Sequence, residues 1–191
     1  MFCLTSTTEY CDTAPNHLVL EQCIALMAVK NTDALRTVYC ETNSAVYGFA
    51  LSILKNEHDA QDVLQETYIK MYAASDSYRP QGKPMAWILT IAKNLARMKL
   101  RERNKTSDTP FEEQEQFFYE PLNLSSEDKM ILNMALKELS SEECQIVLLH
   151  AVSGLKHREI SALLELALPT VLSKYHRALK KLRNKLSEGY K

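Results

Sequence analysis

The sequence predicts an all-α protein made of two small helical domains joined by an acidic linker. Three observations favour this fold class. The chain has 191 residues, of which 46% are hydrophobic, enough for one ordinary domain or two small ones with packed cores. It contains only 4 Gly and 6 Pro, too few for the turns of an all-β protein. Apolar residues recur at spacings of three and four along most of the chain, which is typical of amphipathic helices.

The first predicted domain covers residues 19–106 and follows an N-terminal tail at 1–18. Its helices are expected at 18–30, 33–55, 59–74 and 85–103. Asn56 is placed to cap the third of these helices. The segment 75–84, SDSYRPQGKP, contains two prolines and a glycine, so we expect an irregular loop there.

The second predicted domain covers residues 127–188. Before it, residues 107–126 hold five acidic residues, no basic residue and two prolines, which predicts a linker. The expected helices of the second domain are 127–139, 140–154, 155–166 and 169–186. Gly154 is placed to end the second of them. Pro169 is placed to begin the last one, after an extended Leu168.

The composition excludes several classes of protein. No apolar run approaches the roughly 18–20 residues of a membrane span, and the start, MFCLTSTTEYCDTAP, lacks the pattern of a signal peptide. Five cysteines without a C-x-x-C pair fit neither a disulfide scaffold nor a zinc finger. No glycine-rich phosphate loop can be assembled. We therefore expect a cytoplasmic protein with no membrane insertion, no metal and no cofactor.

The net charge of −1 conceals an uneven distribution of charge along the chain. Segments 76–106 and 151–191 each carry +6, whereas 107–150 carries −8. Basic patches attract polyanions, because each neutralised phosphate releases counterions. Two basic blocks, each on an amphipathic helix, favour a nucleic-acid partner over two merely solvated faces.

Each basic block has a polar face with a composition suited to DNA. Projection at 100° per residue places five residues on the polar face of the 85–103 helix: Thr90, Lys93, Asn94, Arg97 and Arg101. Its apolar face holds Trp87, Ile88, Ile91, Ala92, Leu95 and Met98. The loop before it carries Tyr78, Arg79 and Lys83, and aromatics beside cations suit unstacked bases. In the 169–186 helix the polar face holds Thr170, Ser173, Lys174, Arg177 and Lys181, which suit base edges flanked by phosphates. Its apolar face holds Val171, Tyr175, Ala178, Leu179, Leu182 and Leu186.

Three stretches carry motifs of one known family. HDAQDVLQETYIKMY resembles region 2.2 of bacterial sigma factors, and SYRPQGKPMAWILTIAKNLARMKLRER resembles regions 2.3 and 2.4. The stretch from EDKMILN to HRALKKL resembles region 4, with G-L-x-x-x-E-I and T-V-x-S-K-x-x-R-A at the expected separation. The chain thus resembles the extracytoplasmic-function (ECF, group 4) subfamily of the sigma-70 family of RNA polymerase sigma factors. Residues 19–106 would be region 2 and 127–188 region 4, with no room for regions 1.1 and 3.

The resemblance implies a protein that is not an enzyme but binds core RNA polymerase and directs promoter-specific transcription initiation, as a monomer when free. Asp62, Gln65 and Glu66 would bind the clamp helices of the polymerase β′ subunit, and region 4 would also dock on the β flap. Promoter DNA would contact two sets of residues. For the −10 element these are Tyr78, Arg79, Lys83, Lys93, Asn94, Arg97 and Arg101. For the −35 element they are Thr170, Ser173, Lys174, His176, Arg177 and Lys181.

Other parts of the sequence depart from the family pattern or leave questions open. Pro169 stands where many relatives have Gly, and Leu172 where relatives often carry Arg or Lys. Residues 1–18 match nothing in the family. The acidic linker at 107–126, by contrast, agrees with the family pattern, and the resemblance implies that it threads the basic interior channel of the polymerase. Whether an anti-sigma protein binds the chain stays open at this point.

Two other functions each fit part of the sequence. A stand-alone helix-turn-helix regulator would explain 151–191, but it would leave the basic helical region 59–104 and the acidic linker without a purpose. It would also usually need a dimerisation element. A metal enzyme could use His58, Asp62 and Glu66, which share one helix face. However, a carboxylate site in a helical bundle needs matching ligands from other helices, and the chain has no second E-x-x-H motif.

Overall fold

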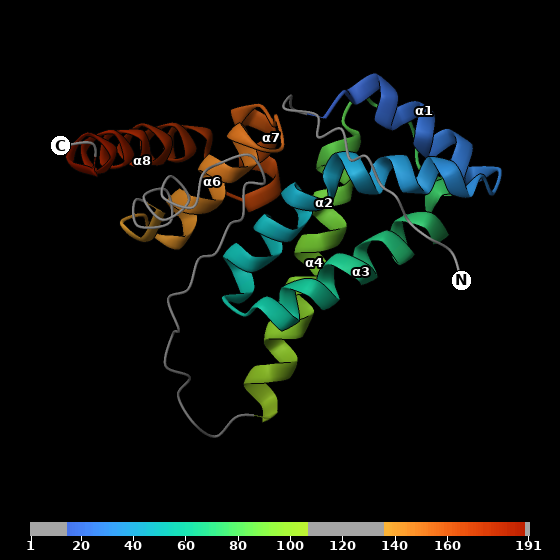
Figure 1. The fold of residues 1–191 in the computed structure, drawn as a ribbon, viewed down its shortest axis with the longest axis horizontal. Coiled ribbons are helices and arrows are strands. Elements are labelled where there is room, and N and C mark those ends of the chain that lie inside the picture. The colour runs from blue at the N-terminus through green and yellow to red at the C-terminus, as the bar shows by residue number, and fades with distance from the viewer. Residues whose placement is uncertain (1–14, 107–135, 190–191) are drawn as a thin grey trace.

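A computed structural model describes residues 15–106 and 136–189, and all regular structure in these ranges is helical. The N-terminal unit consists of α1 (His17–Ala28), α2 (Thr32–Leu54), α3 (Glu57–Ala73), the 3-10 turn η1 (Ser75–Ser77) and α4 (Pro84–Thr106). The C-terminal unit consists of α6 (Ser141–Ala151), α7 (His157–Leu164) and α8 (Leu168–Gly189). Figure 1 shows the C-terminal unit lying beside the N-terminal one. The predicted all-α fold is confirmed.

Polar side chains start several helices where the sequence offers them. Asn16 and Asn31 accept hydrogen bonds from backbone N–H groups in the first turns of α1 and α2, at 3.0–3.1 Å. The predicted cap at Asn56 is confirmed, since its Oδ1 accepts from the N–H of Asp59 at 2.9 Å. Such caps satisfy donors that have no partner inside the helix. Gly154 adopts a positive φ of 68° just after α6, a conformation that favours glycine.

Two local expectations were wrong. Residues 75–77 form the short turn η1 rather than irregular chain, because the hydroxyls of Ser75 and Ser77 donate to the carbonyls of Tyr72 and Ala74, each at 2.8 Å. Leu168 is not extended but is the first residue of α8. Pro169 therefore takes the second helical position, where its missing N–H removes no bond of the helix. The predicted linker and most of the 127–139 helix lie outside the described residues.

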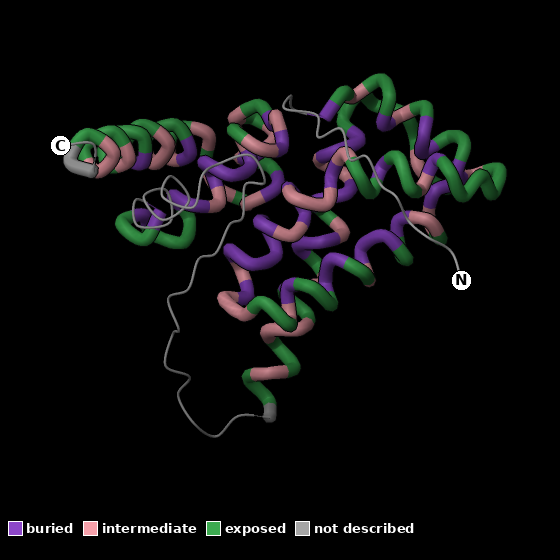
Figure 2. Tube along the Cα trace, viewed as in Figure 1, coloured by how far each residue is buried: buried purple, intermediate pink, exposed green. Residues whose placement is uncertain are grey.

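Helix α2 lies at the centre of the N-terminal unit and packs against α1, α3 and α4. Large side chains that are buried completely or nearly so include Ile24, Phe49, Met71, Ile88 and Leu89. In Figure 2 the buried positions line the inner sides of these helices, whereas much of α8 is exposed. None of the helices in 15–106 or 136–189 has the length and apolar character needed to cross a membrane.

The two units are packed together in this structure. Helix α6 packs on α2, and α7 contacts α4. One buried cluster runs through both units, from Met85 and Ile88 to Ile146 and Ile160. The carbonyl of Ser52 in α2 also accepts a hydrogen bond from the hydroxyl of Ser141 at 3.2 Å. The packing between the two units places α7 beside α4.

Candidate nucleic-acid interface

A cavity of about 410 Å³ lies where the 75–84 segment meets the first turns of α4. Its lining consists of Ser77, Tyr78, Arg79, Gln81, Lys83, Ala86, Trp87 and Thr90. The rings of Tyr78 and Trp87 lie 4.6 Å apart, centroid to centroid, with an angle of 45° between their planes. Aromatic surfaces beside cations can hold an unstacked base by stacking and cation–π contact.

The cavity brings together three residues that the sequence pointed to, Tyr78, Arg79 and Lys83. Three further lining residues, Ala86, Trp87 and Thr90, come from α4. Trp87 was expected on the apolar face; it does pack against the core, but it also lines the cavity. Thr90, one turn further on, was expected on the polar face and is exposed. The helical projection placed both residues but gave no reason to assign either to the cavity.

Glu21 of α1 holds the loop that forms one side of the cavity. Its Oε1 accepts hydrogen bonds from the hydroxyl of Tyr78 at 3.2 Å and from the backbone N–H of Gly82 at 2.7 Å. Burial raises the pKa of Tyr78 to about 12, and the charge of Glu21 acts in the same direction, so Tyr78 remains a donor at neutral pH. Sequence reasoning missed Glu21, because no local pattern links it to residues 57 and 61 positions away.

Lys93 and Arg97, both predicted to contact DNA, are bound to the C-terminal unit. The side chain of Lys93 is only 9% exposed, and its Nζ donates to the carbonyl of Leu163 at 2.8 Å and to Glu165 Oε1 at 2.7 Å. Arg97 Nη1 donates to the same Glu165 oxygen at 3.1 Å. These hydrogen bonds hold the pKa of Glu165 below its usual range, the bond from Lys93 having the larger effect. In this structure Lys93 is therefore covered by the C-terminal unit and is not part of the exposed polar face of α4.

The remaining predicted residues of α4 lie at the surface. Asn94 and Arg101 are exposed. Met98 was expected on the apolar face, but it is 53% exposed. Here α2 and α3 pack on the side of α4 that carries Ala96, and the end of α4 projects beyond α3 (Figure 1).

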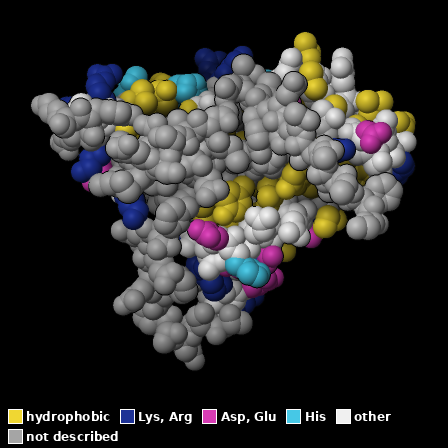
Figure 3. Space-filling model, in the orientation of Figure 1, with side chains coloured by type: hydrophobic (Ala, Val, Ile, Leu, Met, Phe, Trp, Pro, Cys, Tyr) yellow, Lys and Arg dark blue, Asp and Glu magenta, His cyan; other side chains and the backbone are white. Residues whose placement is uncertain are grey.

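The predicted polymerase-binding residues Asp62, Gln65 and Glu66 lie on α3, the first two exposed and Glu66 half-buried. Asp62 is hydrogen-bonded to Lys99 of α4, and this bond lowers the pKa of the Asp62 carboxyl. Glu66 pairs with Lys70 at 3.4 Å. Figure 3 shows acidic, basic and histidine side chains gathered on this part of the surface. It is an open, highly charged surface, suited to binding a macromolecule.

A metal site is poorly supported on this surface. Possible ligand atoms of His58, Asp59 and Asp62 lie within 4.8 Å of one another, whereas the enzyme alternative needed Glu66 in place of Asp59. Lys99 forms ion pairs with both Asp59 and Asp62. A lysine ammonium thus already supplies the positive charge that a bound cation would bring.

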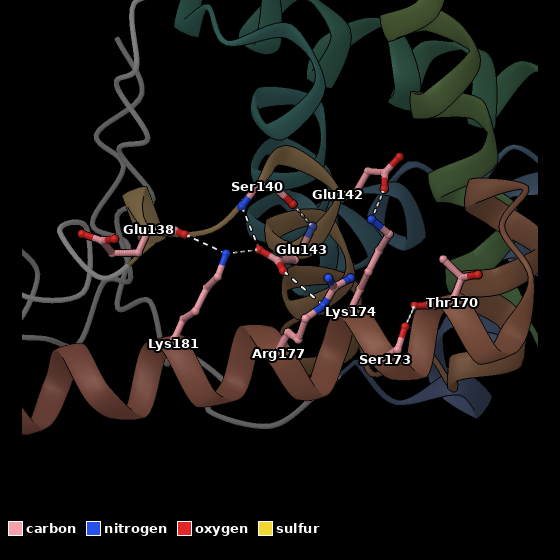
Figure 4. Close-up of polar contacts among 9 residues, drawn as sticks. All are labelled: Glu138, Ser140, Glu142, Glu143, Thr170, Ser173, Lys174, Arg177 and Lys181. Atoms are coloured by element: carbon pink, nitrogen blue, oxygen red, sulfur yellow. Dashed lines mark hydrogen bonds and ion pairs between the residues drawn. The ribbon is translucent and has the colours of Figure 1, made fainter.

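The basic side chains of α8 fall into two groups. One group faces α6: Lys174 pairs with Glu142 at 2.7 Å, and Lys181 pairs with Glu143 at 2.7 Å. Figure 4 shows Lys174, Arg177 and Lys181 reaching from α8 towards these acids. The other group is exposed and includes His176, Lys180 and Arg183, with the polar Ser173 beside them. Arg177 is intermediate, since its side chain is 63% exposed and its Nε lies 3.9 Å from Glu143.

The predicted polar face of α8 was therefore rotated relative to the exposed one. Lys174 has a side chain only 21% exposed, and Thr170 is half-buried. Leu179, expected on the apolar face, is 36% exposed. The apolar residues that α8 buries completely are Val171 and Ala178. The projection correctly placed both of these residues on the apolar face, but it did not single out Lys180 and Arg183, which are exposed.

Glu143 connects the start of α6 to α8. Its side chain is 5% exposed. It accepts from the N–H of Ser140 at 3.0 Å, and the hydroxyl of Ser140 accepts from the N–H of Glu143, which together form a capping box. Burial alone would raise the pKa of Glu143. The hydrogen bonds from Lys181 and Ser140 lower this pKa by more than burial raises it, so the net shift is downward. The carboxylate is therefore charged at neutral pH.

Three aromatic rings, one from each helix of the C-terminal unit, pack against one another. His150 of α6 and His157 of α7 lie 4.5 Å apart, and both contact the ring of Tyr175 of α8 at 5.0 and 4.7 Å. Burial lowers the pKa of His157, and His150 and His176 lower it further. The Nε2 of His157 is buried without a hydrogen-bond partner. The cluster is therefore best accommodated when His157 is neutral.

Comparison with known proteins shows that each of the two units matches a different family model. The family model for Sigma-70 region 2 matches residues 40–106, and the model for Sigma-70, region 4 matches residues 129–182. The sequence is 31% identical to the ECF RNA polymerase sigma-E factor of Salmonella typhimurium (strain LT2) over 141 residues, which are 67% of this chain and 74% of that protein. It is 28% identical to the ECF RNA polymerase sigma factor EcfG of Rhodopseudomonas palustris over 152 residues, 79% of this chain and 84% of that protein.

Solved structures of related proteins show the same fold. The sigma factor RpoE from Bartonella quintana, in complex with the anti-sigma factor NepR, gives a TM-score of 0.64 at 26% identity, covering 80% of this chain and 96% of that one. CnrH, in complex with the cytosolic domain of CnrY, gives 0.57 at 22% identity, covering 89% and 98%. Two helical units, with a basic helix in the first and a second basic helix after a helix-turn-helix bend in the other, agree with these matches. The chain belongs to the ECF sigma factors of the sigma-70 family, non-enzymatic proteins that bind DNA and direct transcription initiation by RNA polymerase.

Proposed function

We propose that the cavity before α4 receives an unstacked base of the promoter −10 element. The observation that carries this proposal is the lining of the cavity, with Tyr78 and Trp87 beside Arg79 and Lys83. A volume of about 410 Å³ accommodates a nucleobase, and the neighbouring cations can bind the adjacent phosphates. Asn94 and Arg101 are exposed further along α4, and they extend this surface along the path of the bound DNA strand.

The cavity is tested with Trp87→Ala in the complex with core polymerase. The probe is a labelled pool of short single-stranded DNA randomised over six positions. Base stacking on an aromatic side chain contributes about 1–3 kcal/mol, so we expect binding to weaken roughly 5-fold to 150-fold. Tyr39→Ala removes a partly exposed ring from α2 and serves as the control. Equal binding by wild type and Trp87→Ala would exclude the cavity as a base site.

We propose that the outer side of α8 reads the −35 element. Ser173, His176 and Arg177 take the base-contacting role, and Lys180 and Arg183, exposed beside them, contact phosphates. Lys174 and Lys181 contribute chiefly by binding the acids of α6. Thr170 lies in the first turn of α8, where its backbone carbonyl accepts from the Ser173 hydroxyl at 3.0 Å.

We propose that α3 binds the clamp helices of the polymerase β′ subunit through Asp62, Gln65 and Glu66, while region 4 also docks on the β flap. Reversing Asp62 and Glu66 to Lys places like charges against the basic partner expected there and should cost a few kcal/mol in core affinity. Glu57→Lys with Glu41→Lys, also on the N-terminal unit, controls for the change in net charge. Unchanged core affinity in the Asp62 and Glu66 double variant would remove this assignment.

We propose that the protein acts in the cytoplasm as a monomer until it meets its partners, and that an anti-sigma protein is one of them. This proposal is supported by RpoE of Bartonella quintana, a relative solved together with an anti-sigma factor. Co-purification of the chain from its own cells, followed by identification of a stoichiometric protein other than polymerase subunits, tests it.

A further inference from the structure

The loop that closes the cavity has little packing of its own. Four consecutive residues, Arg79, Pro80, Gln81 and Gly82, are exposed, and Gly82 has a positive φ of 69° with no heavy atom near the position of a Cβ. Exposed backbone with few apolar contacts opens easily. The shape of the cavity therefore depends on the contacts that anchor this loop to the helices.

Glu21 supplies an anchor from α1, at two points of the loop. One carboxylate oxygen accepts from the Tyr78 hydroxyl at the beginning of the loop and from the Gly82 N–H near its end. The two points are four residues apart, so a single side chain fixes the span that carries Arg79. Hydrogen bonds to an ionised acceptor are about twice as strong as neutral ones.

The same contact orients the aromatic part of the cavity. Tyr78 is held between Glu21 at its hydroxyl and Trp87 at its ring. A tyrosine released from Glu21 can turn its ring into the space that a base needs. Pre-ordering a binding loop increases affinity because its conformational entropy has already been lost before the ligand binds.

We propose that Glu21 is a positioning residue that holds the 78–83 loop in the base-accepting shape before DNA arrives. The inference rests on the proposed function of the cavity as a base site. It assigns to α1 a part in promoter recognition, although α1 contributes no lining residue to the cavity. Because Glu21 touches the loop and not the base, its loss should affect how selectively the cavity accepts bases as well as how tightly.

The test compares Glu21→Ala, Glu21→Gln and the control Gln22→Ala in the complex with core polymerase. Gln22 is the next residue of the same helix, and it is exposed. With the randomised single-stranded DNA pool, we expect Glu21→Ala to bind roughly tenfold more weakly and to show a flatter preference among the four bases at one position. Glu21→Gln keeps an acceptor oxygen and should lose roughly threefold or less. Gln22→Ala should match wild type.

The other readouts separate positioning from general damage to the fold. Core-polymerase affinity and binding of double-stranded −35 DNA should be unchanged in Glu21→Ala. Equal loss in Glu21→Ala and Glu21→Gln, or loss of core affinity in parallel, would overturn the inference. If Trp87→Ala abolishes binding of the pool while Glu21→Ala binds like wild type with unchanged base preference, Glu21 has no positioning role although the cavity is a base site. If neither variant affects binding, the proposed function of the cavity fails as well.

Discussion

Helices α4 and α8 are both long and basic, yet the acids that neutralise them come from different places. On α8, Lys174, Lys181 and Lys185 pair with acids that lie just before or within α6, in the same unit. On α4, Lys99 pairs with acids of α3 in its own unit, but Lys93 and Arg97 pair with Glu165, which belongs to the other unit. The pairs on α8 therefore stabilise one unit, whereas the Glu165 pairs hold two units together.

This difference shows that a basic helix is not by itself an available DNA surface. The exposed residues of α8 can be reached by DNA. Lys174 and Lys181, by contrast, pair with the acids of α6 and stabilise the C-terminal unit. On α4, by contrast, DNA can reach Lys93 only after Glu165 and the Leu163 carbonyl have moved away. The arrangement of ion pairs thus predicts that α8 can bind DNA in the packed state, whereas contact between DNA and Lys93 of α4 requires the units to separate.

The largest expected effect comes from removing the acid that joins α6 to α8. Glu143→Ala deletes a nearly buried carboxylate that Lys181 and Ser140 contact, and leaves the start of α6 without its capping box. Breaking such a pair should lower the free energy of unfolding of the C-terminal unit by about 3 kcal/mol. Glu142→Ala removes a half-exposed acid that pairs with Lys174, and should cost about 0.5 kcal/mol. Urea unfolding followed by circular dichroism measures both; equal losses would contradict the distinction.

The next effect concerns DNA reading by α8 itself. Arg177→Ala should cost about 2 kcal/mol at a −35 element and relax the preference at one base pair if Arg177 contacts a base. Lys185 pairs with Glu138 at 3.7 Å, and Lys185→Ala should at most weaken all sequences alike. Both variants are compared on promoters randomised at −35, at two salt concentrations. Intact preference and activity in Arg177→Ala would show that α8 is not the reading helix.

A smaller effect is expected from breaking the link between the units. Glu165→Gln removes the negative charge that pairs with Lys93 and Arg97. The effect should be small because the Glu165 carboxylate is exposed to solvent, where ion pairs are weak. We expect the free protein to bind single-stranded DNA roughly threefold more tightly and to expand in small-angle X-ray scattering. Glu142→Gln, which alters a pair inside the C-terminal unit, should change neither. A Glu165→Gln protein as compact as wild type would show that the apolar contacts alone keep the units packed.

The smallest effect is a pH dependence confined to the C-terminal unit. Because the pKa of His157 lies below its ordinary value of 6.5 in the folded state, its contribution to stability is present above pH 6.5. This contribution is lost as the pH falls below 6.5, because the unfolded chain then binds a proton at His157 more readily than the folded protein does. We expect a loss of less than about 1 kcal/mol between pH 6.5 and 5.5. His157→Phe should flatten this dependence, whereas His58→Gln, at an exposed position, should keep it.

Much of this fold could be predicted from the sequence because the relevant information is local. The spacing of apolar residues placed the helices, and Asn56 placed the start of α3. Contacts between distant residues leave no such pattern. The position of Lys93 on the polar face of α4 is consistent with solvent or with Glu165, and only the packing of α7 decides between them. The bond from Gly82 to Glu21 spans 61 residues and has no local signature.

The packing of Glu165 against α4 also has a consequence for how binding responds to salt. Each phosphate contact normally makes affinity fall with salt by a fixed increment, about 0.9 in the log–log slope for duplex DNA and about 0.7 for single strands. Lys93 and Arg97, however, must leave a carboxylate before they reach a phosphate, and salt weakens that internal pair too. The two dependences oppose each other. A count of cations read from the salt slope of the free protein will therefore fall short of the number that touch DNA, and Glu165→Gln should make the slope steeper.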